Sequence, residues 1–322
     1  MNRHRTAASV LLAAGALIAG ALTGAAPAAA ADGPASFRQQ HTEGFWTAER
    51  MRSAVPLDVV AAPGPVRHTP AATSDRPTLI APTPASAALP AVSPTAFPQA
   101  GGPWTGGGAV VKTSGRVFFT FGDRTASCSG DSVTSANGST VMTAGHCVKY
   151  QGSWHTNWIF VPGYDNGNAP YGQWTATQTF ATDQWAASED MNMDVGLAVV
   201  APLNGRKLSQ VVGAQGLLFN GGYNKRMYAF GFPAASPYDG SKLVYCSGNS
   251  GKDFLLTKDH SLGCNMTGGS SGGPWFQDFD EATGLGTQVS VNSFGYVFLP
   301  NRMFGPYFGN EAKAVYDKAQ NS

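Results

Sequence analysis

Short apolar and β-branched runs, separated by turn-forming residues, dominate the chain from about residue 103 onward. They occur at 117–121, 131–135, 139–144, 227–232, 243–246, 254–257 and 288–297. Each run is shorter than a typical helix, and glycine, asparagine and proline lie between them. This pattern predicts an antiparallel β-barrel or sandwich.

Two places in this pattern allow more precise predictions. Asn137-Gly138 lies between two of the runs, and this dipeptide favours a two-residue hairpin turn. Helical spacing is found at the C-terminal end, where Ala312, Val315 and Tyr316 would share the inner face of a helix over 311–319. Asn310 would cap that helix.

The first 31 residues have the pattern of a secretory signal peptide. A basic start at 3–5 precedes an apolar stretch at 7–22 and a small-residue cleavage zone at 26–31. The apolar stretch is too short and too weakly apolar for a membrane span. We therefore expect a secreted, extracellular protein with no membrane contact after signal removal.

Residues 32–102 differ from the rest of the chain in composition. Ten prolines between 56 and 98 interrupt any regular element, and a stretch of this kind is not expected to bury enough apolar surface to offset its ordering entropy. We interpret it as a propeptide or linker, with a short helix at 45–55 that ends before Pro56 and docks on the main domain. Residues 103–322 would form that domain as two halves, about 103–205 and 206–322.

Two motifs carry candidate chemistry. The run Gly269-Ser270-Ser271-Gly272-Gly273 would expose a serine on a tight turn, and His146 beside Cys147 would be a base on a rigid mount. Of the six histidines, none follows Ser271, which excludes the α/β-hydrolase chain order. His155 and His260 are expected in surface loops.

A histidine base requires a carboxylate that fixes its tautomer. Seven aspartates lie between His146 and Ser271. Asp194 immediately precedes the apolar run 195–200, so its carboxylate would be shielded from water. It is our candidate for the orienting acid, and Asp190 is the second choice.

The order His146, Asp194, Ser271 resembles that of chymotrypsin-like serine proteases. Residues 160–167 and 170–172 are similar to the secreted bacterial members, including the glutamyl endopeptidase-like group. The resemblance implies an all-β fold of two six-stranded antiparallel barrels packed around a catalytic cleft, with a short C-terminal helix. It implies a monomer that hydrolyses peptide bonds in proteins or peptides without metal or cofactor, and an oxyanion hole formed by the backbone N–H groups of Gly269 and Ser271.

Two further positions in the resemblance concern substrate preference. Asn265 corresponds to the base of the specificity pocket, and Asn292 precedes the segment Ser293-Phe294-Gly295, which resembles the substrate-binding wall. Both asparagines are neutral, so an uncharged residue is expected before the cleaved bond. Ser270 replaces the aspartate that precedes the nucleophile in pancreatic-type enzymes, which argues against activation by an ion pair at that position.

The cysteines and the charge complete the prediction. Four cysteines allow three connectivities; joining Cys128 to Cys147 and Cys246 to Cys264 would brace the loops of His146 and Ser271. No C-x-x-C spacing supports a zinc site, and residues 278–281 are interpreted as a solvated hairpin tip rather than a calcium site. A formal net charge of +1 gives no reason to expect nucleic-acid binding. The alternative function is a catalytically inactive binding or adhesion module with the same fold.

Overall fold

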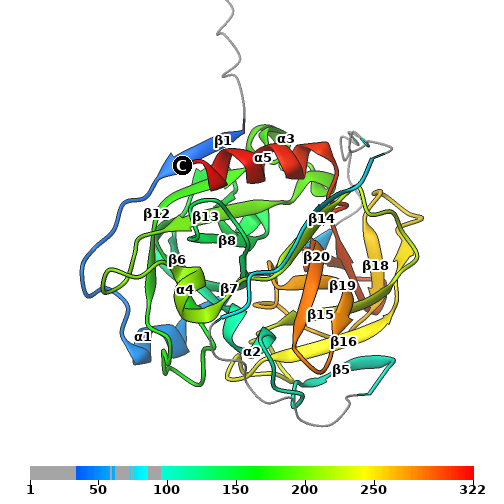
Figure 1. Ribbon diagram of the computed structural model, residues 1–322, viewed down its shortest axis with the longest axis horizontal. Helices are drawn as coiled ribbons and strands as arrows, with labels where there is room; N and C mark the ends of the chain where they lie inside the picture. Colours follow the sequence, from blue (N-terminus) through cyan, green and yellow to red (C-terminus); the bar gives the residue numbers. More distant parts are fainter. Residues whose placement is uncertain (1–33, 59, 62–72, 74–75, 86–95) are drawn as a thin grey trace, which may run out of the picture. The chain divides into compact units, whose positions relative to one another are not determined.

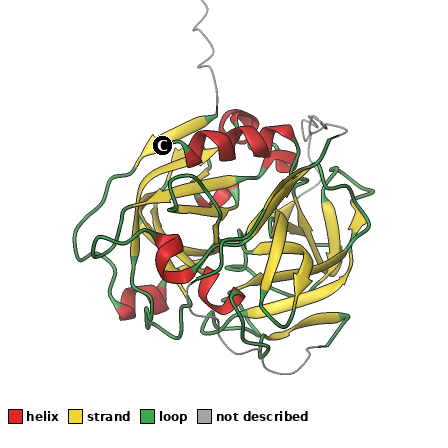
Figure 2. Cartoon of the chain, viewed as in Figure 1, coloured by secondary structure: helices red, strands yellow, loops and turns green. Residues whose placement is uncertain are grey.

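Two β-structured halves lie side by side in the folded chain (Figure 1). The computed structural model describes residues 34–58, 60–61, 73, 76–85 and 96–322, and the predicted signal peptide lies outside them. Strands make up most of the regular secondary structure in both halves, and the helices are short (Figure 2). The prediction of an all-β fold is therefore confirmed. No helix in the described part of the chain combines the length and apolar character needed to cross a membrane.

The first half is a closed antiparallel barrel. Its strands follow the ring order β6 (Ser114–Phe121), β7 (Arg124–Val133), β8 (Thr140–Thr143), β13 (Gly196–Val200), β12 (Trp174–Ala181) and β11 (Thr156–Pro162). Alternate side chains such as Val117, Phe119, Phe160 and Leu197 fill its interior. Helix α5 (Asn310–Gln320) packs against this barrel, as Figure 1 shows.

The second half is barrel-like and consists of two sheets. The larger sheet contains β14 (Gly216–Phe219), β20 (Leu285–Val291), β19 (Pro274–Asp280), β15 (Arg226–Gly231) and β16 (Val244–Asn249). The smaller contains β17 (Gly251–Lys252), β18 (His260–Gly263), β22 (Leu299–Gly305) and β21 (Phe294–Tyr296). Among the strands named in this paragraph, β14 and β20 pair in parallel.

Short elements connect these strands. They are α2 (Val110–Thr113), η1 (Gly145–Cys147), β9 (Lys149–Tyr150), β10 (Ser153–Trp154), α3 (Asp183–Ser188), η2 (Met191–Met193) and α4 (Leu208–Val212). Two of them, η1 and η2, lie at the ends of barrel strands and carry or precede the candidate catalytic residues.

The described parts of residues 34–102 pack on the domain, contrary to the expectation that this stretch buries too little apolar surface. They contribute β1 (Ala35–Arg38), α1 (Ala48–Ser53), β2 (Val55–Pro56), β3 (Val60–Ala61), β4 (Thr78–Ile80) and β5 (Gln99–Pro103). Each strand pairs with an existing sheet, and Trp46, Met51 and Ala54 are buried. These described parts therefore add to a core that the domain already has. The short helix expected at 45–55 is present as α1.

Three local predictions need correction. Strands β7 and β8 are joined by loop 134–139 rather than a two-residue turn, because the Asn137 side chain accepts hydrogen bonds from Ser139 N and Thr140 Oγ1 inside the loop. Helix α5 has Gly309 at its N-cap, and Asn310 is its first residue. The run 254–257 is a loop, organised by Asp253, which accepts from Leu255 N and Thr257 N.

Candidate active site

His146 is held by the buried carboxylate of Asp194. Asp194 Oδ2 lies 2.7 Å from His146 Nδ1, Asp194 Oδ1 accepts from the His146 backbone N–H at 2.8 Å, and neither side chain is exposed. A third bond comes from Ser293 Oγ, which donates to Asp194 Oδ2 at 2.5 Å. Because a carboxylate oxygen accepts, Nδ1 carries the hydrogen of this bond, and in the neutral imidazole Nε2 then keeps its lone pair. Asp190, the second choice, instead caps η2 through Asn192 N.

His155 and His260 are buried, so the expectation that both lie in surface loops is wrong. His155 stacks on Phe119 with 4.3 Å between ring centroids, and its Nε2 lies 2.9 Å from the backbone oxygen of His146. Since a carbonyl only accepts, that nitrogen donates and supports the His146 turn from behind. Burial lowers the pKa of both histidines to about 4, which keeps them neutral at physiological pH.

The loop of Ser271 packs against the strands that lead to His146. Ser129 N donates to Ser271 O at 2.7 Å. Gly272 has a φ of +79°, and a Cβ there would lie 2.1 Å from Thr143 Oγ1, so only glycine allows this approach. The structure thus places the Ser271 loop against the ends of the strands that lead to His146. His146 Nε2 makes no hydrogen bond to any described residue, so the Ser271 hydroxyl is not bonded to it here.

The neighbouring residues Gly269 and Ser270 face different directions. Ser270 Oγ donates to Thr267 O at 2.8 Å, inside its own loop. Gly269 has a φ of +92°, and its backbone N–H donates outward to the carbonyl oxygen of Leu57 at 3.1 Å. This amide is therefore directed at a place where it can hold a carbonyl oxygen, as the predicted oxyanion hole requires.

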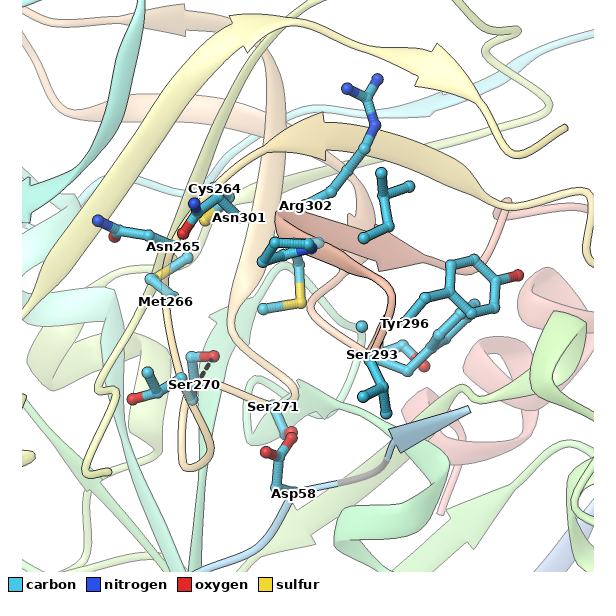
Figure 3. Close-up of a pocket in the computed structure, with 17 residues that line it drawn as sticks. Asp58, Cys264, Asn265, Met266, Ser270, Ser271, Ser293, Tyr296, Asn301 and Arg302 are labelled. Carbon is cyan, nitrogen blue, oxygen red and sulfur yellow. Dashed lines mark hydrogen bonds between the residues drawn. The ribbon is translucent and has the colours of Figure 1, made fainter. Parts of the chain in front are cut away.

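A cavity of about 320 Å³ opens beside Ser271 (Figure 3). Its lining includes residues that the sequence analysis named and others that it missed: Asp58, Asn265, Met266, Ser271, Ser293, Phe294, Gly295, Asn301, Arg302 and Met303. Asn265 Oδ1 accepts from Tyr238 OH at 2.7 Å. Arg302 extends away from Ser271 in Figure 3 and donates to Ser261 Oγ at 3.2 Å.

Asn292 does not line this cavity, although it was expected in the substrate-binding wall. It is fully buried behind the Ser271 loop, where its amide donates to Phe230 O and Ser270 O and its oxygen accepts from Trp275 Nε1. Asn292 lies in the two-residue link between β20 and β21, where these hydrogen bonds turn its side chain behind the Ser271 loop, while Ser293 lines the cavity. Met266, Met303 and Arg302 were missed because no motif surrounds them.

The structure pairs Cys128 with Cys147 and Cys246 with Cys264, the connectivity expected from the two loops. Among the described residues, one group has metal-ligand spacing: His146 with Cys128 and Cys147. Its two sulfurs are bonded to each other and offer no thiolate, so this group does not fit a metal. In loop 278–281, Asp280 caps its own turn by accepting from Ala282 N and Thr283 Oγ1.

Known structures resemble this chain over about two thirds of its length. Protease Anisep from Arthrobacter nicotinovorans is 45% identical and matches over 69% of this chain and 100% of its own, with a TM-score of 0.64. The thermostable serine protease AL20 from an extremophilic microorganism is 40% identical over 66% of this chain and 99% of its own, with a TM-score of 0.63. A Glu endopeptidase is 15% identical over 69% of this chain and 97% of its own, with a TM-score of 0.55, and supports the fold alone.

One curated protein matches over a short segment. It is an extracellular metalloprotease of Bacillus subtilis (strain 168), 38% identical over 61 residues. The match spans 19% of this chain and about a fifth of that protein. No family model matches the chain.

Proposed function

The chain belongs to the chymotrypsin-like serine proteases, and on this premise we propose that it is a secreted endopeptidase with His146, Asp194 and Ser271 as its catalytic triad. The observation that carries the proposal is the buried His146–Asp194 pair, with Nε2 left as an acceptor beside the Ser271 loop. We further propose that the chain is made as a precursor, from which residues upstream of the protease domain are removed.

The residues have the following proposed roles. Ser271 Oγ attacks the peptide carbonyl while His146 Nε2 takes its proton, and Asp194 stabilises the imidazolium that forms. The N–H groups of Gly269 and Ser271 stabilise the negative oxygen of the tetrahedral intermediate. His146 then protonates the leaving amine, and water releases the acyl group from Ser271. These steps require no metal or organic cofactor.

We propose protein or peptide substrates with an uncharged residue before the cleaved bond. Asn265, Met266 and Met303 are neutral residues of the cavity lining, and the acidic Asp58 belongs to the upstream residues that processing would remove. The charge of Arg302 is directed away from Ser271 and toward Ser261. The proposal does not take up metal-dependent chemistry from the Bacillus protein's name, because the cysteines of the candidate ligand group form a disulfide.

A serine-directed fluorophosphonate tests the triad. The protein is purified from culture medium after processing, and the labelled peptide is identified by mass spectrometry. We expect the label on Ser271, none on Ser271→Ala, and normal labelling of Ser270→Ala. Absence of label on the processed wild type would favour the inactive binding module, and label on Ser270 would overturn the nucleophile assignment.

A further inference from the structure

A segment upstream of the protease domain crosses the candidate active site. We call residues 55–58 and 60–61 the cleft strap. Its first part, β2, pairs with Ala126 and Ser127 of β7 in the first barrel, and its last part, β3, pairs with Gly295 and Tyr296 of β21 in the second half. The strap thus connects the two walls between which a substrate would bind.

The strap engages one donor of the proposed oxyanion hole and lines the adjoining cavity. Leu57 N donates to Ser127 O at 2.9 Å, and Leu57 O accepts from Gly269 N at 3.1 Å. Asp58 lines the same cavity as Ser271, beside which it lies in Figure 3. A Cβ on Gly268 would lie 2.9 Å from Asp58 Cβ, so the strap backbone is in close contact with the loop. A substrate carbonyl and the Leu57 carbonyl cannot occupy this place together.

The strap runs in the direction opposite to a substrate. In the proposed reaction, residues before the cleaved bond lie along β21, and the leaving amine lies toward the first barrel, which carries His146. In the strap, residues after Leu57 lie along β21, in parallel pairing, and residues before Leu57 lie along β7. The Asp58 nitrogen is therefore on the β21 side, where His146 cannot protonate it as a leaving group.

The strap is anchored upstream by buried side chains. Trp46 packs against Phe118 and donates from Nε1 to Asn157 O, and Met51 of α1 is 1% exposed. These contacts hold the strap beside the cleft. Its binding to the cleft is therefore intramolecular, and the effective concentration of the strap at the cleft is high.

We propose that the cleft strap inhibits the precursor by binding the active site in reverse, with the Leu57 carbonyl in the oxyanion hole. This regulation rests on the proposed function, because it blocks the same serine. The cleft is thus occupied by a peptide segment of the same chain. This segment resists cleavage because its backbone runs opposite to that of a substrate.

Labelling of the intact precursor tests the block. The full chain is treated with the fluorophosphonate in timed samples, and mass spectrometry separates intact from shortened chains. We expect Ser271 in the intact wild type to react at least about tenfold more slowly than in a variant with residues 57–61 replaced by Gly-Ser-Gly-Ser-Gly. The matched control replaces β1 with glycine and serine, because β1 pairs with β12 and is outside the cleft lining. Its intact chain should react as slowly as wild type.

Two engineered cysteine pairs test the direction, in a Ser271→Ala background that prevents self-cleavage. Val60→Cys with Gly295→Cys should form a disulfide, because these positions are paired in the parallel register. Val55→Cys with Gly295→Cys should not, although a strap in the substrate direction would bring them together. The reverse result would overturn the proposed direction.

The outcomes separate the two proposals. If processed protein and intact strap variant both fail to react, the proposed function is wrong. If processed protein reacts and the intact wild type reacts equally fast, the protease proposal stands and the strap proposal is wrong. If the β1 control accelerates as much as the strap variant, the block does not depend on the cleft contacts and the strap proposal is likewise overturned.

Discussion

The two adjacent serines differ in what their hydroxyl groups contact. Both residues line the cavity, but Ser270 Oγ donates to Thr267 O within its own loop, and no such bond holds Ser271 Oγ among the described residues. We predict that Ser271→Ala lowers kcat/KM by about four to six orders of magnitude, because triad members act as one unit. Ser270→Ala should cost less than about tenfold, the loss of one neutral hydrogen bond. Steady-state hydrolysis of a peptide amide measures both, and similar losses would contradict the assignment.

A carboxylate at position 265 should change the substrate preference. Asn265 lines the cavity, and its Oδ1 accepts from Tyr238 OH, a bond that aspartate can keep. We predict that Asn265→Asp raises kcat/KM about tenfold or more for substrates with Lys or Arg before the cleaved bond, through a charge-assisted contact. Asn301→Asp adds the same charge elsewhere in the lining and serves as the control. Equal effects of both variants would show that Asn265 is not the pocket base.

The sequence allowed a proposal for residues that must act together in one reaction. It did not predict the positions of residues whose surroundings depend on packing. His146, Asp194 and Ser271 could be proposed because each requires the others, and only this histidine follows a strand-like run. The burial of His155 could not be predicted, because its neighbours in 151–157 are mostly polar and the ring on which it stacks, Phe119, lies on another strand. Asn292 was expected in the cavity lining, but it lies between β20 and β21, and its direction is set by hydrogen bonds to Phe230 and Ser270, which are distant in the sequence.

At the scale of elements, helix α1 is the anchor of the cleft strap. Trp46 is buried against Phe118, and removing a buried tryptophan side chain costs about 3–5 kcal/mol. We predict that Trp46→Ala detaches this helix and its flanks before the barrels unfold. Amide hydrogen exchange over residues 46–56 should accelerate strongly, with exchange in β6 and β7 unchanged.

The neighbouring Phe45 offers a matched control. It is partly exposed and is stacked at its edge on Trp46, so Phe45→Ala removes an aromatic ring without opening the buried contact. Exchange over 46–56 should change little in this variant. An equal acceleration in both variants, or a parallel loss of protection in β6, would contradict the anchoring role of Trp46.

Strands could be predicted where an apolar run has a buried face. The prediction failed where an apolar run has no buried face. The run 117–121 lies within β6 because its side chains fill the barrel. The run 254–257 is equally apolar, yet Phe254 is 75% exposed and Asp253 organises the backbone as a loop. Composition also could not locate β5, which spans the expected boundary at 102–103, because its pairing with β16 depends on a distant strand.

At the scale of the whole molecule, the barrel architecture followed from the resemblance, while the course of residues 34–102 did not. Proline-rich composition predicted that this stretch buries too little apolar surface, yet Trp46, Met51 and Ala54 are buried. It does not reveal that isolated pieces can each pair with a sheet edge already formed, as β1 does with β12 and β4 does with β14. The cleft strap crosses the cleft through the same kind of interaction, because β2 pairs with β7 and β3 pairs with β21.

Stability of the whole fold should depend on pH through Asp131, which lies buried on β7. Its Oδ1 accepts from Ser114 Oγ at 3.1 Å, and its Oδ2 has no hydrogen-bond partner among the described residues. Burial raises its pKa to about 8, and hydrogen bonds from Thr113 and Ser114 offset this only in part. The folded chain therefore keeps a proton that the unfolded chain releases above about pH 4. This group contributes stability at low pH that is lost as pH rises toward 8.

Buried His155 and His260 act in the opposite direction, because their pKa values are lowered to about 4 and their contribution is lost as pH falls from about 6.5 toward 4. The histidine and aspartate contributions to the unfolding free energy change over overlapping pH ranges in the wild type. A variant that changes Asp131 alone is therefore compared with its parent. We predict that Asp131→Asn, relative to its parent, gains unfolding free energy by up to about 1.4 kcal/mol for each pH unit between 4 and 8. Urea unfolding in a Ser271→Ala background measures this difference without self-digestion. Asp123→Asn, exposed at the β6–β7 turn, is the control and should show no such trend. A pH-independent difference between Asp131→Asn and its parent would mean that Asp131 is ionised in the folded protein.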